Sequence, residues 1–337
     1  MKKAKNHMLD IFCLSLITTI SLCLCSPVHG DEKSLLRKGP AFTDLDKRYR
    51  MPEQWREKKI SRDSWAKGAN LAVTLDQHLY PAISNIIFDF AEKSRLKVAI
   101  HEGTCGISAG LLIQKKVDVG GFCCPAGVND RLPDLEFHTI GIAGIAIIVH
   151  PDNPIKNLGL EQLRDIFQGK IYSWDQVMDG AIKRPIRVIG RLHCKQRPGH
   201  WRLLLENEDL FSPNMIEVGT IKDMIERVAK DKAAIGYEVI YNLVHYKQSA
   251  PVKYIRINNA DPSSLEDVAS LHYPLYRTYN ITTWKNGKNN PLHPSYNLIR
   301  HIIASLDKID PAYSIVPVTL LKKHGWKFIN DELIGEP

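Results

Sequence analysis

The segment that decides the fold runs from Ile145 to Val177 and reads IAIIVHPDNPIKNLGLEQLRDIFQGKIYSWDQV. Residues 145–149 are mostly β-branched and predict a short buried strand, which the proline-containing turn at 150–154 ends. Beyond the turn, apolar residues recur at helical spacing and predict a helix that stops at Gly169; they are Leu160, Leu163, Ile166 and Phe167. A strand followed by a helix in this way is typical of an α/β protein.

The same alternation extends to both sides of this segment. On the amino side we expect strands at 71–75, 96–100 and 117–120, with helices between them. On the carboxyl side we expect a strand at 186–189, a helix from Trp201, an amphipathic helix from Thr220, strands at 252–257 and 273–281, and a helix at 296–306. Alternating strands and helices predict a mainly parallel sheet, in which ligands bind at the carboxyl ends of the strands.

Four stretches together resemble the phosphate-binding branch of the bacterial periplasmic substrate-binding proteins: NPIKNLGLEQLRDIFQGKIYSW at 153–174, PIRVIG at 185–190 followed by Arg191, AAIGY at 233–237, and YPLYR at 273–277. The resemblance covers roughly residues 66 to 325. It implies a two-lobed type 2 periplasmic binding fold of the α/β class, in which each lobe is a mainly parallel sheet flanked by helices and two crossover strands join the lobes. It also implies a monomeric, non-catalytic protein that closes over a small ligand by hinge motion near residues 145–147 and 237–240. Such a protein hands its ligand to an ABC-type membrane transporter or reports it to a sensor.

The amino end predicts export from the cytoplasm. Three lysines precede an apolar run at 11–24, and the residues at 28–30 suit cleavage near Gly30, so residues 1–30 are interpreted as a signal peptide and the mature protein as periplasmic or secreted. A retained membrane anchor is the alternative. Residues 31–65 are then a polar extension, residues 66–146 together with 239–337 form lobe 1, and residues 147–238 form lobe 2.

Composition limits the choice of partner. The 337-residue chain has a formal charge of +8, which falls to +6 once three lysines and one aspartate leave with the signal peptide. This mild excess suits ordinary solvated surface, or the attraction of anions or of an acidic partner. A basic run with interleaved aromatic residues is missing from the sequence, which argues against nucleic acid as a partner.

The resemblance also implies where a ligand binds. In the family an anion is held by the loop after the second strand, by a carboxylate after the third strand, and by an arginine followed by a Ser-Gly-Thr loop in the other lobe, because amides at helix starts stabilise a buried oxyanion. Carried over to this sequence, the ligand-binding positions are Gly103, Thr104, Cys105, Gly106, Cys123 and Arg191. The Ser-Gly-Thr loop is missing, since LHCKQRPGH follows Arg191 at 192–200.

All four cysteines expected in the mature chain fall in these loops, and two histidines lie beside the last of them. Thiolate and imidazole are ligands for soft and borderline metals, so we predict a site for zinc, copper(I) or a thiophilic metalloid formed by Cys105, Cys123, Cys124, His193, Cys194 and His200. Three alternatives stay open: structural disulfides, a phosphate or related oxyanion site with incidental cysteines, and a Cys/His thiol enzyme, which lacks a recognisable acid to orient the histidine.

Five further residues receive a weaker assignment. His78 and His101 lie near the same strand ends and are second choices as ligands. Tyr276 and Arg277 are interpreted as packing and sheet-edge residues, and Asp118 as a turn or cap residue.

Overall fold

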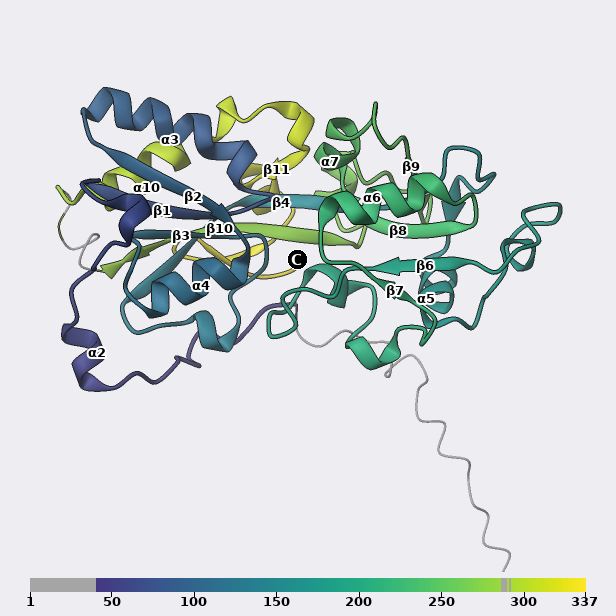
Figure 1. Ribbon diagram of the computed structural model, residues 1–337, viewed down its shortest axis with the longest axis horizontal. Helices are drawn as coiled ribbons and strands as arrows, with labels where there is room; N and C mark the ends of the chain where they lie inside the picture. Colours follow the sequence, from purple (N-terminus) through teal and green to yellow (C-terminus); the bar gives the residue numbers. More distant parts are fainter. Residues whose placement is uncertain (1–40, 286–289, 291) are drawn as a thin grey trace, which may run out of the picture. The chain divides into compact units, whose positions relative to one another are not determined.

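A computed structural model describes residues 41–285, 290 and 292–337 (Figure 1). The expected signal peptide, residues 1–30, lies outside the described residues, and so does the first part of the extension, residues 31–40. Among the described helices, none has the length and apolar character that crossing a membrane requires.

In the described part of the chain, 11 strands form one sheet, whose main order is β2-β1-β3-β10-β4-β8-β6-β7. The strands are β1 (Leu71–Asp76), β2 (Val98–Gly103), β3 (Val119–Phe122), β4 (Leu135–Val149), β5 (Asn157–Leu158), β6 (Arg187–Gly190), β7 (Ile216–Glu217), β8 (Ala234–Val239), β9 (Lys253–Ile257), β10 (Tyr276–Trp284) and β11 (Ile315–Pro317). A separate hairpin pairs β12 (Lys327–Ile329) with β13 (Glu332–Gly335).

Parallel and antiparallel pairs divide the sheet. Strand β1 is parallel to β2 and β3, and β6 is parallel to β7 and β8, as the alternation of strands and helices predicts. Between these two groups lie the long strands β4 and β10, which pair antiparallel with each other. Strand β4 extends ten residues before the segment 145–149 expected from the sequence, and it pairs with β8 from Ile145 onward. It therefore runs as a crossover strand from one half of the sheet to the other.

The α-helices are α2 (Glu53–Glu57), α3 (Tyr80–Ser94), α4 (Cys105–Ile113), α5 (Leu160–Gln168), α6 (Ile221–Lys230), α7 (Ile240–His245), α8 (Leu265–Ala269), α10 (Pro294–Ala304) and α11 (Val318–Lys323). Short 3-10 helices are η1 (Ser64–Ala66), η2 (Val128–Asp130), η3 (Trp174–Gln176), η4 (His200–Leu203), η5 (Glu208–Leu210), η6 (Leu306–Lys308) and η7 (Pro311–Tyr313). Helix α5 ends where predicted, because Gly169 adopts the left-handed conformation (φ 81°) that closes a helix. The helix expected from Trp201 is only the short η4.

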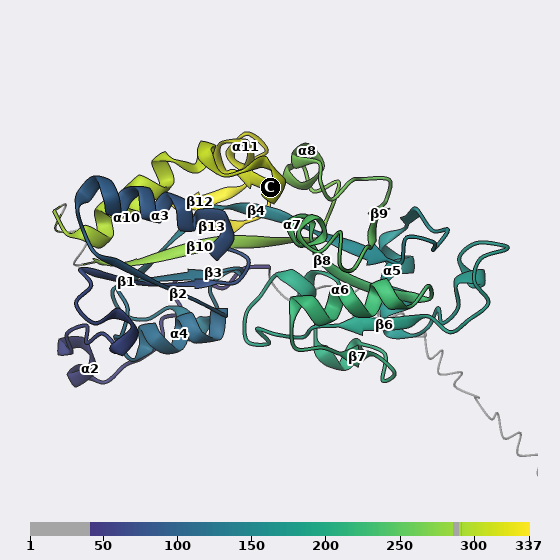
Figure 2. The ribbon, with the colours of Figure 1, turned by 45° about the horizontal axis from the view of Figure 1, so that its top comes forward.

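The buried apolar residues form two hydrophobic cores, of which the second extends to Val316 and Leu333 in the carboxyl-terminal part of the chain. The first lies around β1, β3, α3 and α10, where α3 and α10 pack together on one face of the sheet and α4 lies on the other (Figures 1 and 2). The second lies around β8, α5 and α6. Strand β9 packs in the second core through Ile255 and Ile257, although the sequence analysis placed it in lobe 1. The reason is its pairing with residues 147–149 of β4.

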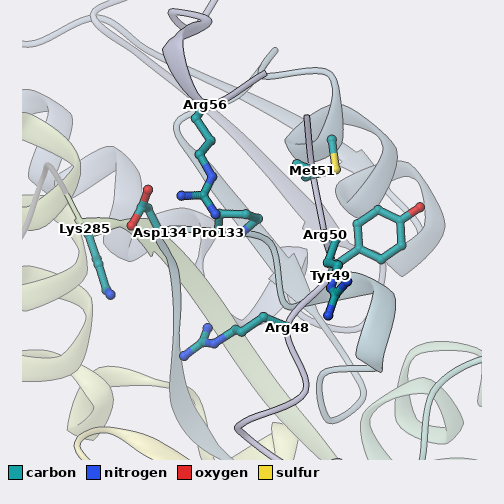
Figure 3. Close-up of a pocket in the computed structure, with 8 residues that line it drawn as sticks. All are labelled: Arg48, Tyr49, Arg50, Met51, Arg56, Pro133, Asp134 and Lys285. Carbon is teal, nitrogen blue, oxygen red and sulfur yellow. The ribbon is translucent and has the colours of Figure 1, made fainter. Parts of the chain in front are cut away.

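The described part of the polar extension, residues 41–65, lies against lobe 1. The Tyr49 amide donates a hydrogen bond to the Arg131 carbonyl at 2.9 Å. The Trp55 ring lies 6.0 Å from the Trp284 ring, and its indole N–H donates to the Ile113 carbonyl. Arginines of this extension border a surface pocket next to β4 (Figure 3).

Candidate ligand-binding site

Three loops of lobe 1 meet at the carboxyl ends of β1, β2 and β3. Because these strands are parallel neighbours, their ends lie at one edge of the sheet. After β1 the chain reaches His78, after β2 it reaches Cys105 at the first position of α4, and after β3 it reaches Cys123 and Cys124. Thr104 caps α4, since its side-chain oxygen accepts a hydrogen bond from the Ile107 amide at 3.3 Å.

The loop after β6 brings a fourth cysteine from lobe 2. Arg197 of this loop forms a buried ion pair with Asp130 at 2.6 Å, and it also donates to the Cys105 carbonyl at 3.3 Å. Cys194 in the same loop has a positive φ of 57°, which is uncommon for a residue with a β-carbon. The ion pair thus holds the Cys194 loop against the start of α4.

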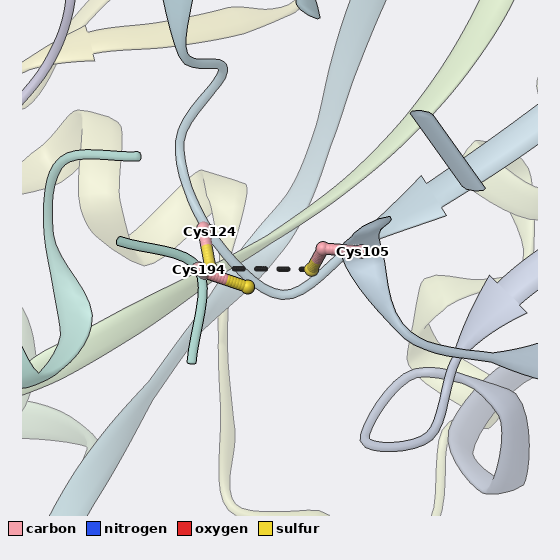
Figure 4. Close-up of side chains that lie close together, drawn as sticks. All are labelled: Cys105, Cys124 and Cys194. Carbon is pink, nitrogen blue, oxygen red and sulfur yellow. Dashed lines mark hydrogen bonds between the residues drawn. The ribbon is translucent and has the colours of Figure 1, made fainter. Parts of the chain in front are cut away.

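The four thiols form one cluster. The Cys105 and Cys123 sulfurs lie 3.4 Å apart, the Cys123 and Cys124 sulfurs 3.9 Å apart, and the Cys105 and Cys124 sulfurs 4.0 Å apart. Figure 4 shows Cys194 of lobe 2 meeting Cys105 and Cys124, and the three sulfurs lie within 4.8 Å of one another. Three of the cysteines are fully buried, Cys194 is partly buried, and all four are free thiols.

A buried network of charged groups adjoins the thiols. The His78 ring lies between two carboxylates, with Nδ1 2.9 Å from Asp76 and Nε2 3.0 Å from Glu238. Arg277 lies 3.2 Å from His78 and donates to the Cys123 sulfur at 3.1 Å. Because Glu238 belongs to β8 and the others to lobe 1 strands or the loops after them, this network also joins the two lobes.

The network sets the protonation of its members. Burial and Arg277 lower the pKa of His78, but Glu238, Asp76 and Cys123 outweigh them and raise it to about 10. Burial likewise disfavours the Glu238 carboxylate, yet His78 and Arg277 hold its pKa well below its usual range. Burial and the charge of Cys123 raise the pKa of Asp76. His78 and Glu238 are therefore a buried cation–anion pair.

The thiols are electrostatically unequal. Burial raises the pKa of Cys105 and of Cys124 well above the usual value. Burial also opposes ionisation of Cys123, but hydrogen bonds from Cys105 and Cys124, together with the Arg277 charge, hold its pKa well below the usual value. Hydrogen bonds from the same two thiols lower the pKa of Cys194. The cluster thus contains thiolates that neighbouring thiols and an arginine stabilise.

Several buried polar atoms beside the cluster lack a partner among the described residues. They are Nη1 of Arg191, Nε2 of His193, Nε2 of His200 and Nε of Arg277. The His193 ring stacks on His200 at 5.2 Å and faces His78 at 6.5 Å. Burial and His193 hold the pKa of His200 well below its usual value, so its imidazole is neutral. Buried polar atoms normally have partners, so these four atoms are candidates for contacts with a bound ligand.

The structure brings some of the predicted residues together and leaves others at the margin. Of the predicted metal ligands, Cys105, Cys123 and Cys124 lie within 4.0 Å of one another, and Cys194 lies within 4.8 Å of Cys105 and Cys124. His193 and His200 belong to neither group of possible ligand atoms among the described residues. Gly103 ends β2 and Gly106 belongs to the first turn of α4. Arg191 is held through its backbone by the Tyr237 hydroxyl, and its Nε donates to the Gly219 carbonyl at 3.2 Å.

Sequence reasoning missed part of this site. Arg277 was interpreted as a sheet-edge residue, but it is fully buried and contacts Cys123. Asp76 and Glu238 were not singled out at all. A signal did exist, because a charged residue inside an otherwise apolar strand must find a buried partner. Asp118 was interpreted as a turn residue, but its carboxylate pairs with Arg62 at 2.8 Å. His101 lies against the Trp65 ring at 5.3 Å.

Two groups of side chains in the cluster could hold a metal ion. A tetrahedral zinc ion with Zn–S bonds of about 2.3 Å separates its sulfurs by roughly 3.8 Å. The Cys105–Cys124 separation of 4.0 Å is close to that value, Cys194 lies within 4.8 Å of both sulfurs, and the Cys105–Cys123 separation of 3.4 Å is shorter. A second group of possible ligand atoms comprises Asp76, Cys105 and Cys123. Cys105 belongs to this group and to the group of Cys105, Cys124 and Cys194, so an ion could be held by either set of ligands.

Comparison with known proteins relates the chain to a family of binding proteins. A profile of the PBP superfamily domain matches residues 126–296. The phosphate-binding protein PstS of Pseudomonas aeruginosa is 25% identical over 233 residues, which are 65% of this chain and 68% of that protein. PstS of Bacillus subtilis is 23% identical over 230 residues, which are 65% of this chain and 73% of that protein.

Solved structures show the same fold. A phosphate ABC transporter substrate-binding protein from Clostridium perfringens, with bound phosphate, superposes with a TM-score of 0.63 at 18% identity over 74% of this chain and 99% of that one. An ABC-type phosphate transport receptor from Vibrio cholerae gives a TM-score of 0.57 at 20% identity over 77% of this chain and 100% of that one. Both share the two-lobed α/β fold of this chain.

Proposed function

The chain belongs to the PBP superfamily, and from this premise we propose that it is a solute-binding protein that captures a soft metal ion or metalloid with the thiols of Cys105, Cys124 and Cys194. One observation carries the proposal: thiols from three separate segments and both lobes lie within 4.8 Å of one another. The relatives are named as binding proteins and receptors, which supports capture rather than turnover.

The donor set favours a thiophilic ligand over a hard one. Thiolate sulfur selects zinc, copper(I) and similar soft centres, while phosphate prefers N–H, hydroxyl and guanidinium donors. Two of the three thiols have raised pKa values, so capture must release their protons. Full burial of Cys105 and Cys124 excludes water, which would otherwise compete for the ion.

The two-lobed architecture couples capture to closure. Cys105 and Cys124 belong to lobe 1, whereas Cys194 arrives on the lobe 2 loop that Arg197 anchors to Asp130. An ion that binds all three sulfurs therefore stabilises the closed arrangement over any open one, as hinge-closing binding proteins require. We propose that the closed protein acts in the periplasm and delivers its cargo to an ABC-type transporter, by analogy with the named relatives.

Phosphate is the second candidate ligand. The relatives are phosphate-binding proteins, and the unpartnered atoms Nη1 of Arg191 and Nε of Arg277 are donors that suit an oxyanion. Against phosphate stand the acceptor groups of the same cluster, namely Glu238 and the Cys123 thiolate, which repel an anion. The missing Ser-Gly-Thr loop removes further donors.

A pair of variants separates the two candidates. Reduced, metal-free protein is titrated calorimetrically with zinc, copper(I), arsenite and phosphate, and so are Cys194→Ser and Arg191→Gln. If the thiols bind the cargo, Cys194→Ser loses soft-ion binding while Arg191→Gln keeps it. If the protein binds phosphate, wild type responds to phosphate alone, Arg191→Gln loses that response, and Cys194→Ser retains it.

A further inference from the structure

The polar extension borders a basic pocket that none of the four clustered cysteines lines (Figure 3). The pocket has a volume of about 490 Å³, which lies within the range of roughly 300–1,000 Å³ typical of small-molecule sites. Its lining consists of Arg48, Tyr49, Arg50, Met51 and Arg56 from the extension, with Pro133 and Asp134 before β4 and Lys285 after β10.

The extension is fixed in place, so these cations are held together. The Tyr49 amide bonds to the Arg131 carbonyl at 2.9 Å, and Trp55 packs on Trp284. The Lys115 ammonium lies over the ring of Trp55 in α2, 4.4 Å from the ring centre. A chain held at these points presents its arginines to one concave surface.

The charges in the pocket are unbalanced. Arg48, Arg50, Arg56 and Lys285 meet a single lining carboxylate, Asp134, and none of these cations forms an ion pair within the described residues. Burial lowers the pKa of the nearby Lys115, Asp134 opposes this effect, and Lys58 adds to it. Like charges gathered in one pocket repel each other, and an anion with several charges relieves that repulsion.

We infer that this pocket binds a molecule or headgroup that carries two or more phosphate groups. Guanidinium groups bind phosphate oxygens through paired hydrogen bonds, and several arginines in one pocket suit several phosphates. Arg48 and Arg56 belong to the extension and Lys285 follows β10, so cations from separate segments line the pocket together (Figure 3). A free polyphosphate and a phospholipid headgroup share this chemistry.

The test uses the full mature chain with inorganic tripolyphosphate as the free probe and cardiolipin-containing vesicles as the lipid probe. Arg50 and Arg56 are exposed, so Arg50→Gln/Arg56→Gln changes charge without removing a packed side chain. The matched control is Arg227→Gln/Arg300→Gln, which removes the same charge from exposed positions on α6 and α10.

We expect the double variant to weaken binding of at least one probe by roughly tenfold per arginine, while the control variant binds as wild type does. Asp134→Asn should strengthen binding, and the fold tolerates it because asparagine accepts the positive φ of 63° at this position. Tripolyphosphate binding assigns the site to a free polyanion, and binding to vesicles alone assigns it to a lipid headgroup. The inference is overturned if neither probe binds more tightly than about 1 mM, or if the control variant loses as much affinity as the double variant.

Discussion

The Nε2 atom of His78 lies 3.0 Å from the Glu238 carboxylate, so an ion pair without access to solvent joins the loop after β1 to strand β8. His78 has its pKa raised to about 10 and Glu238 has its pKa held below the usual range, so both are charged near neutral pH. The pair lies beside the thiol cluster, and Arg277 connects the two through Cys123. We therefore expect closure of the lobes and ionisation of Cys123 to be linked through Arg277.

Removal of one member of this pair should be costly. Glu238→Gln leaves the His78 cation buried without its main counter-charge, and we expect a loss of about 3 to 5 kcal/mol in the free energy of unfolding. Urea denaturation followed by circular dichroism measures the loss. Glu226→Gln on the exposed face of α6 is the control and should change stability by less than about 0.5 kcal/mol. An unchanged midpoint in Glu238→Gln would show that the pair contributes little.

Because of the same pair, we expect the free energy of unfolding to depend on pH. The pKa of Glu238 is depressed in the folded protein. Its contribution to stability is therefore present above its unfolded pKa of 4.5 and is lost as pH falls. His78 has a raised pKa, so its contribution is full below the unfolded value of 6.5 and is lost as pH rises toward about 10. The stability difference between wild type and Glu238→Gln should therefore be largest between these unfolded values and shrink on both sides. A difference that does not vary with pH contradicts the assignment.

Arg277 should control the ionisation of Cys123. Arg277→Met removes the nearby positive charge, and we expect the pKa of the Cys123 thiol to rise. Arg277→Lys keeps the charge and should preserve most of the effect. The pKa of Cys123 is measured by ultraviolet titration of its thiolate, in protein whose other cysteines are replaced by serine. Identical titration curves for the Met and Lys variants would show that the charge of Arg277 does not control the ionisation of Cys123.

The Arg197–Asp130 pair should anchor the Cys194 loop. Arg197→Met leaves the Asp130 carboxylate buried without its partner, and we expect unfolding free energy to fall by about 3 to 5 kcal/mol. The double variant Arg197→Met/Asp130→Leu should recover part of this loss, because both charges are then absent. Soft-ion affinity should fall in both variants, since neither holds Cys194 close to Cys105. Full affinity in both variants would mean that the loop is positioned by other contacts.

Local patterns predicted most of the elements. The spacing of Leu160, Leu163 and Phe167 and the stop at Gly169 correspond to α5 with its left-handed cap. Thr220 caps α6 through a hydrogen bond to the Asp223 amide, and the predicted apolar stripe of that helix is buried. Long-range strand pairing was harder to predict from the sequence. Strand β9 joins the second core because it pairs with β4, and no local sequence pattern indicates this pairing.

The candidate site was predictable only as far as strand ends could be located. Cys105, Cys123 and Cys124 meet because parallel strands end at one edge, a rule that needs no coordinates. The role of Arg277 was not accessible, because it lies inside an antiparallel strand and reaches the site across the sheet. Glu238 was missed for a similar reason, since its partner His78 is 160 residues away in the sequence.

X-ray absorption at the metal edge of protein loaded with one equivalent of zinc or copper(I) tests the central proposal most directly. If Cys105, Cys124 and Cys194 hold the ion, the spectrum of zinc-loaded protein shows three sulfur neighbours at about 2.3 Å. Cys194→Ser should then show one sulfur fewer, and Arg191→Gln should give the wild-type spectrum. A shell of only oxygen and nitrogen, or failure of either ion to bind stoichiometrically to the reduced protein, would contradict the proposal and favour phosphate as the cargo.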